Sequence, residues 1–111
     1  MNDLVTKKCA PCEGGVAALP ADRAQTLLQQ LDSRWELDES SGQLACPFSF
    51  SDFHQTMAFV NAVAWIAIKE DHHPDLTVGY DKVGVVYTTH AIGGLSENDF
   101  ICAAKIDRLM V

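Results

Sequence analysis

Three of the four histidines in this 111-residue chain lie within the stretch KEDHHPDLTVGYDKVGVVYTTH, residues 69 to 90. His72 and His73 are adjacent and precede Pro74, and His90 ends an apolar run with a two-residue period. Imidazole has an unperturbed pKa near 6.5, so it can bind a metal ion or transfer protons near neutral pH. Each histidine could instead be a dipole partner or a cap at the end of a helix.

Of these two reactive roles, metal binding is the less favoured. Adjacent histidines point in different directions unless the backbone breaks between them, and a zinc site would need a further ligand at a suitable spacing. Cys9 and Cys12 form a single Cys-x-x-Cys, a weak signal without a second pair, and both could be plain surface thiols. No Ser or Cys lies in a nucleophile elbow. We therefore predict no metal and no cofactor.

Composition excludes several classes of partner. The chain has 8 basic and 15 acidic residues, a net charge of −7, and no Lys/Arg cluster, so direct nucleic-acid binding is not expected. The N-terminal residues contain no continuous apolar segment typical of a secretory signal, and the longest apolar stretch, MAFVNAVAWIAI, is interrupted by Asn61. We expect a cytoplasmic protein with no membrane contact, in which Cys9, Cys12, Cys46 and Cys102 are reduced thiols.

Two kinds of periodicity alternate along the chain and predict the elements that position the histidines. Helical spacing of apolar residues covers residues 20–31, 51–70 and 96–109. Apolar and polar residues alternate, as in half-buried strands, over residues 35–37, 43–50, 76–80 and 83–89. The order α-β-β-α-β-β-α predicts an α+β fold with a four-stranded antiparallel sheet and helices packed on one face.

This pattern also sets the expected domain organisation. Residues 1–19 should be a partly ordered lead-in, and residues 20–111 a single domain. A sheet covered on one face leaves its other face and its edges open to self-association, so we expect a homo-oligomer, a dimer or a tetramer.

Local signals refine the boundaries of these elements. Ser51 is the expected N-cap of the long helix, with Asp52 as an acidic residue in its first turn. That helix should end near residues 71–73, because the residue before Pro74 is disfavoured in the helical region. Pro47 indicates an edge position or a bulge. Residues 91–95, AIGGL, are expected to form a loop, and His54 should lie on the surface.

The stretch HHPDLTVGYDKVGVVYTTHAIGGLSENDF resembles the signature of the pterin-4a-carbinolamine dehydratase family: His-His-Pro, an aromatic residue, a distal His and an Asp. Five residues separate Pro74 from Tyr80, nine separate Tyr80 from His90, and eight separate His90 from Asp99, and all three gaps fit the spacing in that family. The segments CEGGVAAL, FSFSDF and AAKID extend the resemblance over nearly the whole chain.

The resemblance implies dehydration of a 4a-hydroxytetrahydropterin, the product of aromatic amino-acid hydroxylases, to quinonoid dihydropterin and water. Hydroxide must be protonated to leave, and N5 must lose its proton, so one acid and one base are sufficient. The resemblance assigns acid–base catalysis to His72 and His90, and binding or proton exchange to His73. The substrate-binding positions that it implies are Pro74, Thr89, Ala91, Ile92 and Asp99.

Several alternatives remain open from the sequence. Asp99 could hold a histidine tautomer, or it could be the N3 residue of a Ser-x-x-Asp capping box that starts at Ser96. Tyr80 could line the ring edge or belong to the core. Members of the family commonly carry a charged or polar residue one helical turn before the first histidine, where this chain has Ile68. Animal members also serve as dimerisation cofactors of a transcription factor, so a binding protein without enzymatic activity is the competing function.

Overall fold

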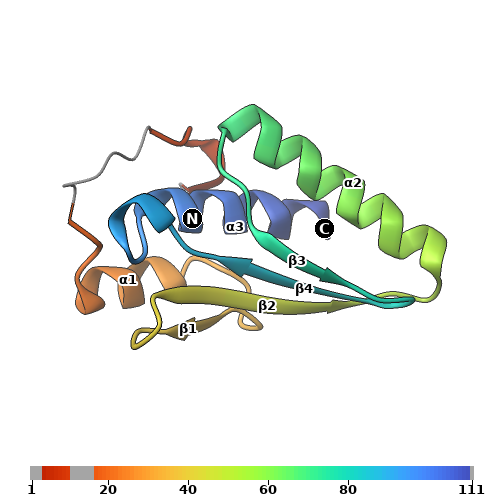
Figure 1. Ribbon diagram of the computed structural model, residues 1–111, viewed down its shortest axis with the longest axis horizontal. Coiled ribbons are helices and arrows are strands. Elements are labelled where there is room, and N and C mark those ends of the chain that lie inside the picture. Colours follow the sequence, from red (N-terminus) through yellow and green to blue (C-terminus); the bar gives the residue numbers. More distant parts are fainter. Residues whose placement is uncertain (1–3, 11–16, 111) are drawn as a thin grey trace.

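A computed structural model describes residues 4–10 and 17–110, and it has the predicted α+β architecture (Figure 1). The helical elements are η1 (Leu4–Thr6), α1 (Ala21–Leu28), α2 (Phe53–Glu70), η2 (His90–Ile92) and α3 (Glu97–Leu109), of which η1 and η2 are 3-10 turns. The strands are β1 (Glu36–Asp38), β2 (Gln43–Ser49), β3 (Asp75–Val78) and β4 (Lys82–Tyr87). The predicted fold class is therefore confirmed.

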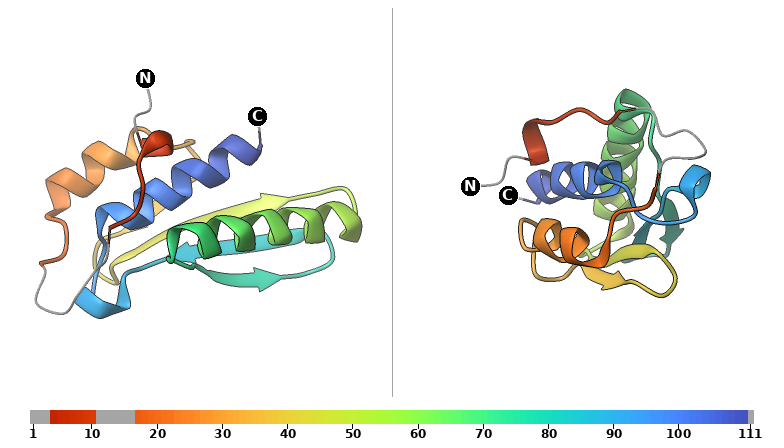
Figure 2. Two further views of the ribbon diagram at one scale, coloured as in Figure 1. Left: turned by 90° about the horizontal axis from the view of Figure 1, so that it is seen from above. Right: turned by 90° about the vertical axis from the view of Figure 1, so that its left-hand side faces the viewer.

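The four strands form one antiparallel sheet in the order β1-β2-β4-β3. Its end-on view in Figure 2 shows the three α-helices on the same side of the sheet. Alternation decides which side chains face them, because successive residues of a strand point to opposite faces. Along β2, Leu44, Cys46 and Phe48 are buried, and the register pairs them with Tyr87, Val85 and Val83 of β4, which are buried too.

The helices complete the core over this face. α2 contributes Phe59, Val63 and Ile66, and α1 contributes Ala24 and Leu27. α3 is the most deeply buried helix, with a run from Asn98 to Ala104 that is buried throughout. It places chemically active side chains, including Asp99 and Cys102, in the interior.

Three local predictions change in the structure. The N-cap of α2 is Asp52 rather than Ser51, because the Asp52 carboxylate accepts a hydrogen bond from Gln55 N at 2.8 Å. Residues 90–92 form the turn η2 rather than the start of a loop. Tyr80 lies in the β3–β4 turn and is neither core nor cavity wall. It is 65% exposed and stacks on Phe53 at the start of α2.

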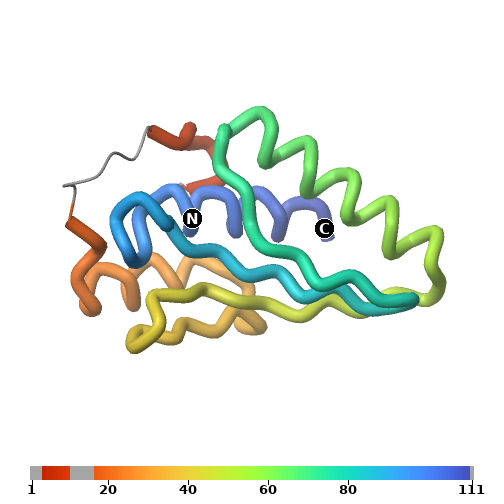
Figure 3. The backbone as a smooth tube through the Cα atoms, viewed as in Figure 1, coloured from red at the N-terminus to blue at the C-terminus, as the bar shows by residue number. Residues whose placement is uncertain are grey.

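The prediction for Pro47 agrees with the sheet register. β1 pairs with β2 only as far as Ala45, so Pro47 lies beyond this pairing, where only β4 is paired with β2. Figure 3 shows that the β3–β4 turn and the β2–α2 connection meet at one end of the sheet. The C-terminal end of α2 and η2 lie at the opposite end, which is where His72, His73 and His90 are.

Candidate active site

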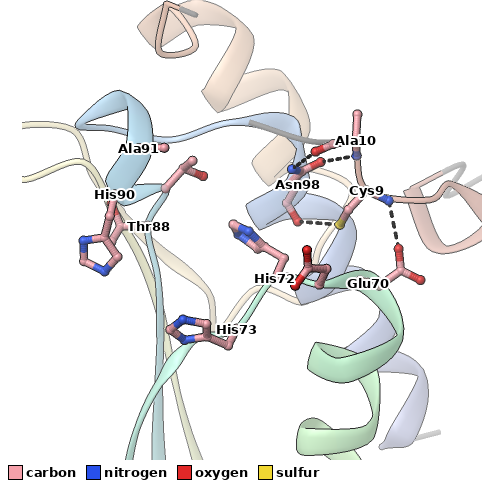
Figure 4. A pocket seen from close by; sticks show the side chains of 11 residues that line it. Cys9, Ala10, Glu70, His72, His73, Thr88, His90, Ala91 and Asn98 are labelled. Atoms are coloured by element: carbon pink, nitrogen blue, oxygen red, sulfur yellow. Dashed lines mark hydrogen bonds between the residues drawn. The ribbon is translucent and has the colours of Figure 1, made fainter. Parts of the chain in front are cut away.

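A cavity of about 380 Å³ opens between the C-terminal end of α2, the end of β4 and η2 (Figure 4). It is lined by Cys9, Ala10, Glu70, Asp71, His72, His73, Thr88, Thr89, His90, Ala91 and Asn98. The three clustered histidines of the sequence therefore border one cavity. His54, on the first turn of α2, is exposed and is not part of the lining.

A reversal of the backbone at Asp71 brings the adjacent histidines to the cavity. Helix α2 ends at Glu70, and Asp71 takes the left-handed conformation with φ of 52°. Asp is among the few residues other than Gly that adopt this conformation readily. Both Asp71 N and His72 N donate to Ala67 O, which closes the end of the helix. His72 is then half-buried, whereas His73 is exposed.

His72 forms an ion pair with a fully buried carboxylate. Its Nε2 lies 2.6 Å from Asp99 Oδ1, and the Asp99 side chain has no solvent exposure. Burial by itself would lower the pKa of His72, but the hydrogen bond to Asp99 and the negative charges of Asp99 and Cys102 outweigh it. The pKa of His72 is therefore raised above its ordinary value, and Nδ1 is the ring nitrogen left for proton exchange.

Asp99 fulfils both alternatives that the sequence left open. Its Oδ2 accepts from the backbone N of Ser96 at 2.9 Å, which is the capping-box contact at the start of α3. The same Oδ2 accepts from Thr89 Oγ1 at 2.8 Å. With His72 on Oδ1, the carboxylate has a partner on each oxygen, as a buried charge requires.

Tyr87 fixes the plane of the His72 ring from the other side. The two rings are stacked with centroids 5.8 Å apart and an interplanar angle of 6°. Tyr87 is buried at the end of β4, and burial and the neighbouring Cys102 raise the pKa of its phenol. A carboxylate and an aromatic face thus hold the imidazole in one orientation.

His73 and His90 are the exposed histidines of the cavity. His73 Nδ1 lies 3.4 Å from Pro74 O, and His90 begins η2. Figure 4 shows both side chains on the side of the cavity away from Cys9. They are open to a ligand that enters from solvent.

One wall of the cavity is formed by Cys9 and Ala10, which the sequence did not place near the histidines. Cys9 N donates to Glu70 Oε1 at 2.8 Å, and Ala10 exchanges two hydrogen bonds with the Asn98 side chain, at 3.0 and 2.6 Å. Burial would raise the pKa of Glu70, but the Cys9 N–H and the Lys105 charge lower it overall. Residues 9 and 10 are thereby fastened to α2 and α3, so Cys9 is not a plain surface thiol, and Cys12 lies outside the described residues.

Not every predicted residue borders the cavity. Thr89 and Ala91 do, whereas Pro74, Ile92 and Asp99 are outside its lining, Asp99 because it lies behind His72. Ile68 is 73% exposed and is also absent from the lining. Within residues 4–10 and 17–110, no group of three or more His, Cys, Asp or Glu side chains is arranged to hold a metal ion.

Thr89 supports a prediction about stability. Its hydroxyl bonds both Asp99 Oδ2 and Ser96 Oγ, each at 2.8 Å, and the residue is 4% exposed. Thr89→Val should lower the free energy of unfolding by about 1.5–3 kcal/mol, because a buried carboxylate loses a donor. Urea unfolding measures this difference. Thr89→Ser keeps the hydroxyl and should lose clearly less; equal losses in the two variants would show that the hydrogen bond is not the cause.

The fold and the cavity define a small α+β protein whose site brings together three imidazoles and a buried carboxylate. The profile of the family described as Pterin 4 alpha carbinolamine dehydratase matches residues 17–109. The chain belongs to this family, and membership indicates a dehydratase that acts on a pterin carbinolamine.

Similar sequences carry the same provisional name, pterin-4-alpha-carbinolamine dehydratase. One from Nitrosomonas eutropha is 58% identical over 109 residues, which covers 98% of this chain and 95% of the relative. One from Nitrosospira multiformis is 59% identical over 109 residues, covering 98% and 94% of the two chains. One from Legionella pneumophila is 54% identical over 110 residues, covering 99% and 97%.

Two solved structures are similar to this fold. A protein from Brucella melitensis, titled a transcriptional coactivator/pterin dehydratase, superposes with a TM-score of 0.78 at 29% identity and covers 83% of this chain and 97% of its own. A pterin dehydratase-like protein, titled a RuBisCO assembly factor in the alpha-carboxysome, superposes with a TM-score of 0.59 at 25% identity, covering 68% and 87%.

Proposed function

We propose that this protein is a 4a-hydroxytetrahydrobiopterin dehydratase, which converts 4a-hydroxytetrahydropterin to quinonoid dihydropterin and water. The observation that carries this proposal is the arrangement of His72, His73 and His90 around one cavity, with His72 paired to the buried Asp99. The reaction needs one proton donor and one proton acceptor near neutral pH, and these residues can supply both.

His72 is the better candidate for the acid. Its raised pKa keeps the imidazole protonated to higher pH, and Asp99 holds Nε2 so that Nδ1–H can protonate the departing hydroxyl at C4a. As the C4a–O bond breaks and water leaves, N5 releases its proton and the C4a=N5 bond forms. His90 is then the base that accepts this proton, and His73 binds the pterin and exchanges protons with it.

The neighbouring turn completes the proposed binding site. Thr89 and Ala91 border the cavity beside His90, and their backbone groups, with those of Pro74 and Ile92, would contact the edge of the pterin. Asp99 would act on the substrate through His72, because it has no exposed surface of its own. The protein's part in this mechanism is to bind the pterin and to move protons, and the residues of the chain suffice for both.

The cellular setting is also a proposal. We expect the enzyme to be cytoplasmic and to recycle the pterin cofactor of an aromatic amino-acid hydroxylase. The part of the chain that the structure describes contains no helix that is both long and apolar enough to cross a membrane.

An exposed apolar surface on α2 supports self-association and also a second candidate function. Trp65 is 63% exposed and Ile68 is 73% exposed, and large apolar side chains on a surface often mark an interface. We propose that this surface mediates the homodimer or homotetramer. The alternative is a regulatory binding protein, a role that accords with the words coactivator and assembly factor in the titles of the two similar structures.

The first test is the rate of dehydration of freshly generated 4a-hydroxytetrahydropterin, followed by ultraviolet absorbance after treatment with a chelator. The wild-type protein should accelerate the reaction clearly above the rate in buffer. His54→Ala should match the wild type, because His54 is exposed and outside the cavity. A wild-type rate equal to that of buffer would refute the dehydratase and favour the binding protein.

A further inference from the structure

Two cysteines that the proposed dehydration does not use lie in contact beside the active-site cavity. Cys9 Sγ and Cys102 Sγ are 3.5 Å apart, although 93 positions separate the two residues in the chain. Cys9 follows η1 and borders the cavity, whereas Cys102 is fully buried in α3. Both are free thiols in the structure.

The contacts around this pair hold the two sulfurs in place. Cys9 Sγ also lies 3.7 Å from Asn98 O, and Cys9 N donates to Glu70 Oε1. Cys102 Sγ lies 3.9 Å from His72 O, so the pair touches the backbone of the proposed acid. The position of Cys9 therefore results from hydrogen bonds to both α2 and α3.

We propose that Cys9 and Cys102 form a redox-active dithiol, and that its reversible closure to a disulfide fastens the N-terminal wall of the active-site cavity covalently to α3. A disulfide has an S–S distance of about 2.05 Å, so the sulfurs must approach by roughly 1.5 Å. Because hydrogen bonds already hold the Cys9 backbone beside α3, this approach needs only a local adjustment.

The electrostatics of the pair favour this reactivity. The pKa of Cys102 is lowered overall. The hydrogen bond with Cys9 and the positive charge of His72 lower it, and together they outweigh burial, which raises it. The same hydrogen bond and burial raise the pKa of Cys9. Cys102 is thus the more readily deprotonated of the two thiols, and because the thiolate is the nucleophilic form of cysteine, this favours attack of Cys102 on an oxidised Cys9.

Hydrogen peroxide, or another hydroperoxide small enough for the cavity, is the oxidant class that fits. It would reach Cys9, which borders the cavity, before the buried Cys102. The Cys9 thiol attacks one peroxide oxygen, the O–O bond breaks, the thiol proton leaves with the departing hydroxide as the first water, and Cys9 becomes a sulfenic acid. The Cys102 sulfur then displaces the hydroxyl of the sulfenic acid as a second water. The two thiols lose two electrons, which reduce one peroxide to two waters.

The setting explains why this pair would be a switch and not a permanent crosslink. In a reducing compartment the dithiol is the resting form, and disulfides there are usually transient. Closure would join residues 93 positions apart, which strongly restricts the unfolded chain. The oxidised protein should therefore resist denaturant better than the reduced protein, and a reductant should reverse the difference.

The test counts thiols in full-length protein, under denaturing conditions, before and after peroxide at one equivalent per chain. The wild type has four cysteines and should fall from four thiols to two, and peptide mapping without reductant should recover one Cys9–Cys102 crosslink. Cys46→Ser and Cys12→Ser should each fall from three thiols to one. Cys9→Ser should keep three, and Cys102→Ser should lose at most the Cys9 thiol, as a sulfenic acid, and form no crosslink.

Several outcomes would overturn the proposal: a Cys9–Cys12 crosslink, a crosslink between chains, or loss of two thiols in Cys102→Ser. Cys46 is the matched control, because it is also buried but its sulfur faces Pro47 O instead. Should Cys102→Ser fail to fold, Cys9→Ser gives the same test at a half-buried position. The urea midpoint of the oxidised wild type should lie above that of the reduced protein and should fall back to the reduced value after dithiothreitol. Equal midpoints would refute a covalent link between the N-terminal wall of the cavity and α3.

Discussion

His72→Gln should slow the dehydration of 4a-hydroxytetrahydropterin by about 10²–10⁴-fold at neutral pH, because it removes the proposed general acid. Glutamine can still donate a hydrogen bond to the buried Asp99, so the carboxylate need not lose its partner. The loss should appear mainly in kcat, measured by ultraviolet absorbance under saturating substrate. His72→Ala should lose at least as much activity and also some stability, since it leaves a buried charge unpaired.

His90→Ala provides the second arm of this experiment. If His90 is the base, this variant should also lose about 10²-fold or more in rate, with little change in the free energy of unfolding, because its side chain is exposed. His54→Ala is the matched control on the first turn of α2 and should keep the wild-type rate. If His72→Gln and His90→Ala both stay within about threefold of wild type, acid–base catalysis by these residues is wrong.

The periodicity of the sequence was sufficient to predict the sheet. Alternation over residues 43–50 predicts a strand with one buried face, and Leu44, Cys46 and Phe48 of that face are buried. Alternation failed at Tyr80, because a two-residue period assigns a face but not the point at which a strand leaves the core. Tyr80 lies past the end of β3, in the β3–β4 turn, where it stacks on Phe53 at the start of α2 but stays 65% exposed.

The candidate site was predictable only in part. Local signals indicated the histidines and the end of α2 before Pro74, but not the left-handed conformation of Asp71 that directs His72 inward. Contacts of Cys9 with Glu70 and Cys102, and of Ala10 with Asn98, join segments between 61 and 93 residues apart. No periodicity encodes such pairs, because they depend on how an irregular segment packs against two finished helices.

Asp99→Asn should reduce the rate of dehydration by about 10²-fold or more, although it conserves the shape of the side chain. An asparagine oxygen can still accept from Ser96 N and Thr89 Oγ1, so its amide would point toward His72. That amide donates a hydrogen bond where the carboxylate accepts one. Neutral His72 would then accept on Nε2 and carry its proton on Nδ1, which is the opposite of the tautomer that Asp99 imposes.

The same substitution should move the pH dependence in a defined direction. Without the Asp99 hydrogen bond and charge, burial dominates and the pKa of His72 falls. The loss of kcat/KM that accompanies deprotonation of the acid should therefore begin at lower pH in Asp99→Asn than in wild type. An unchanged profile with an equal loss of rate at every pH would mean that Asp99 acts only as the cap of α3.

The pH dependence of stability gives an independent check on the direction in which Asp99 shifts the pKa of His72. A histidine whose pKa is raised on folding stabilises the protein fully below its unfolded pKa, about 6.5, and this contribution disappears as pH rises through the folded value. The difference in free energy of unfolding between wild type and Asp99→Asn should therefore be larger near pH ~6 than near pH ~9. A capping role alone would give the same difference at both pH values, since the contact with Ser96 N does not depend on the charge of His72.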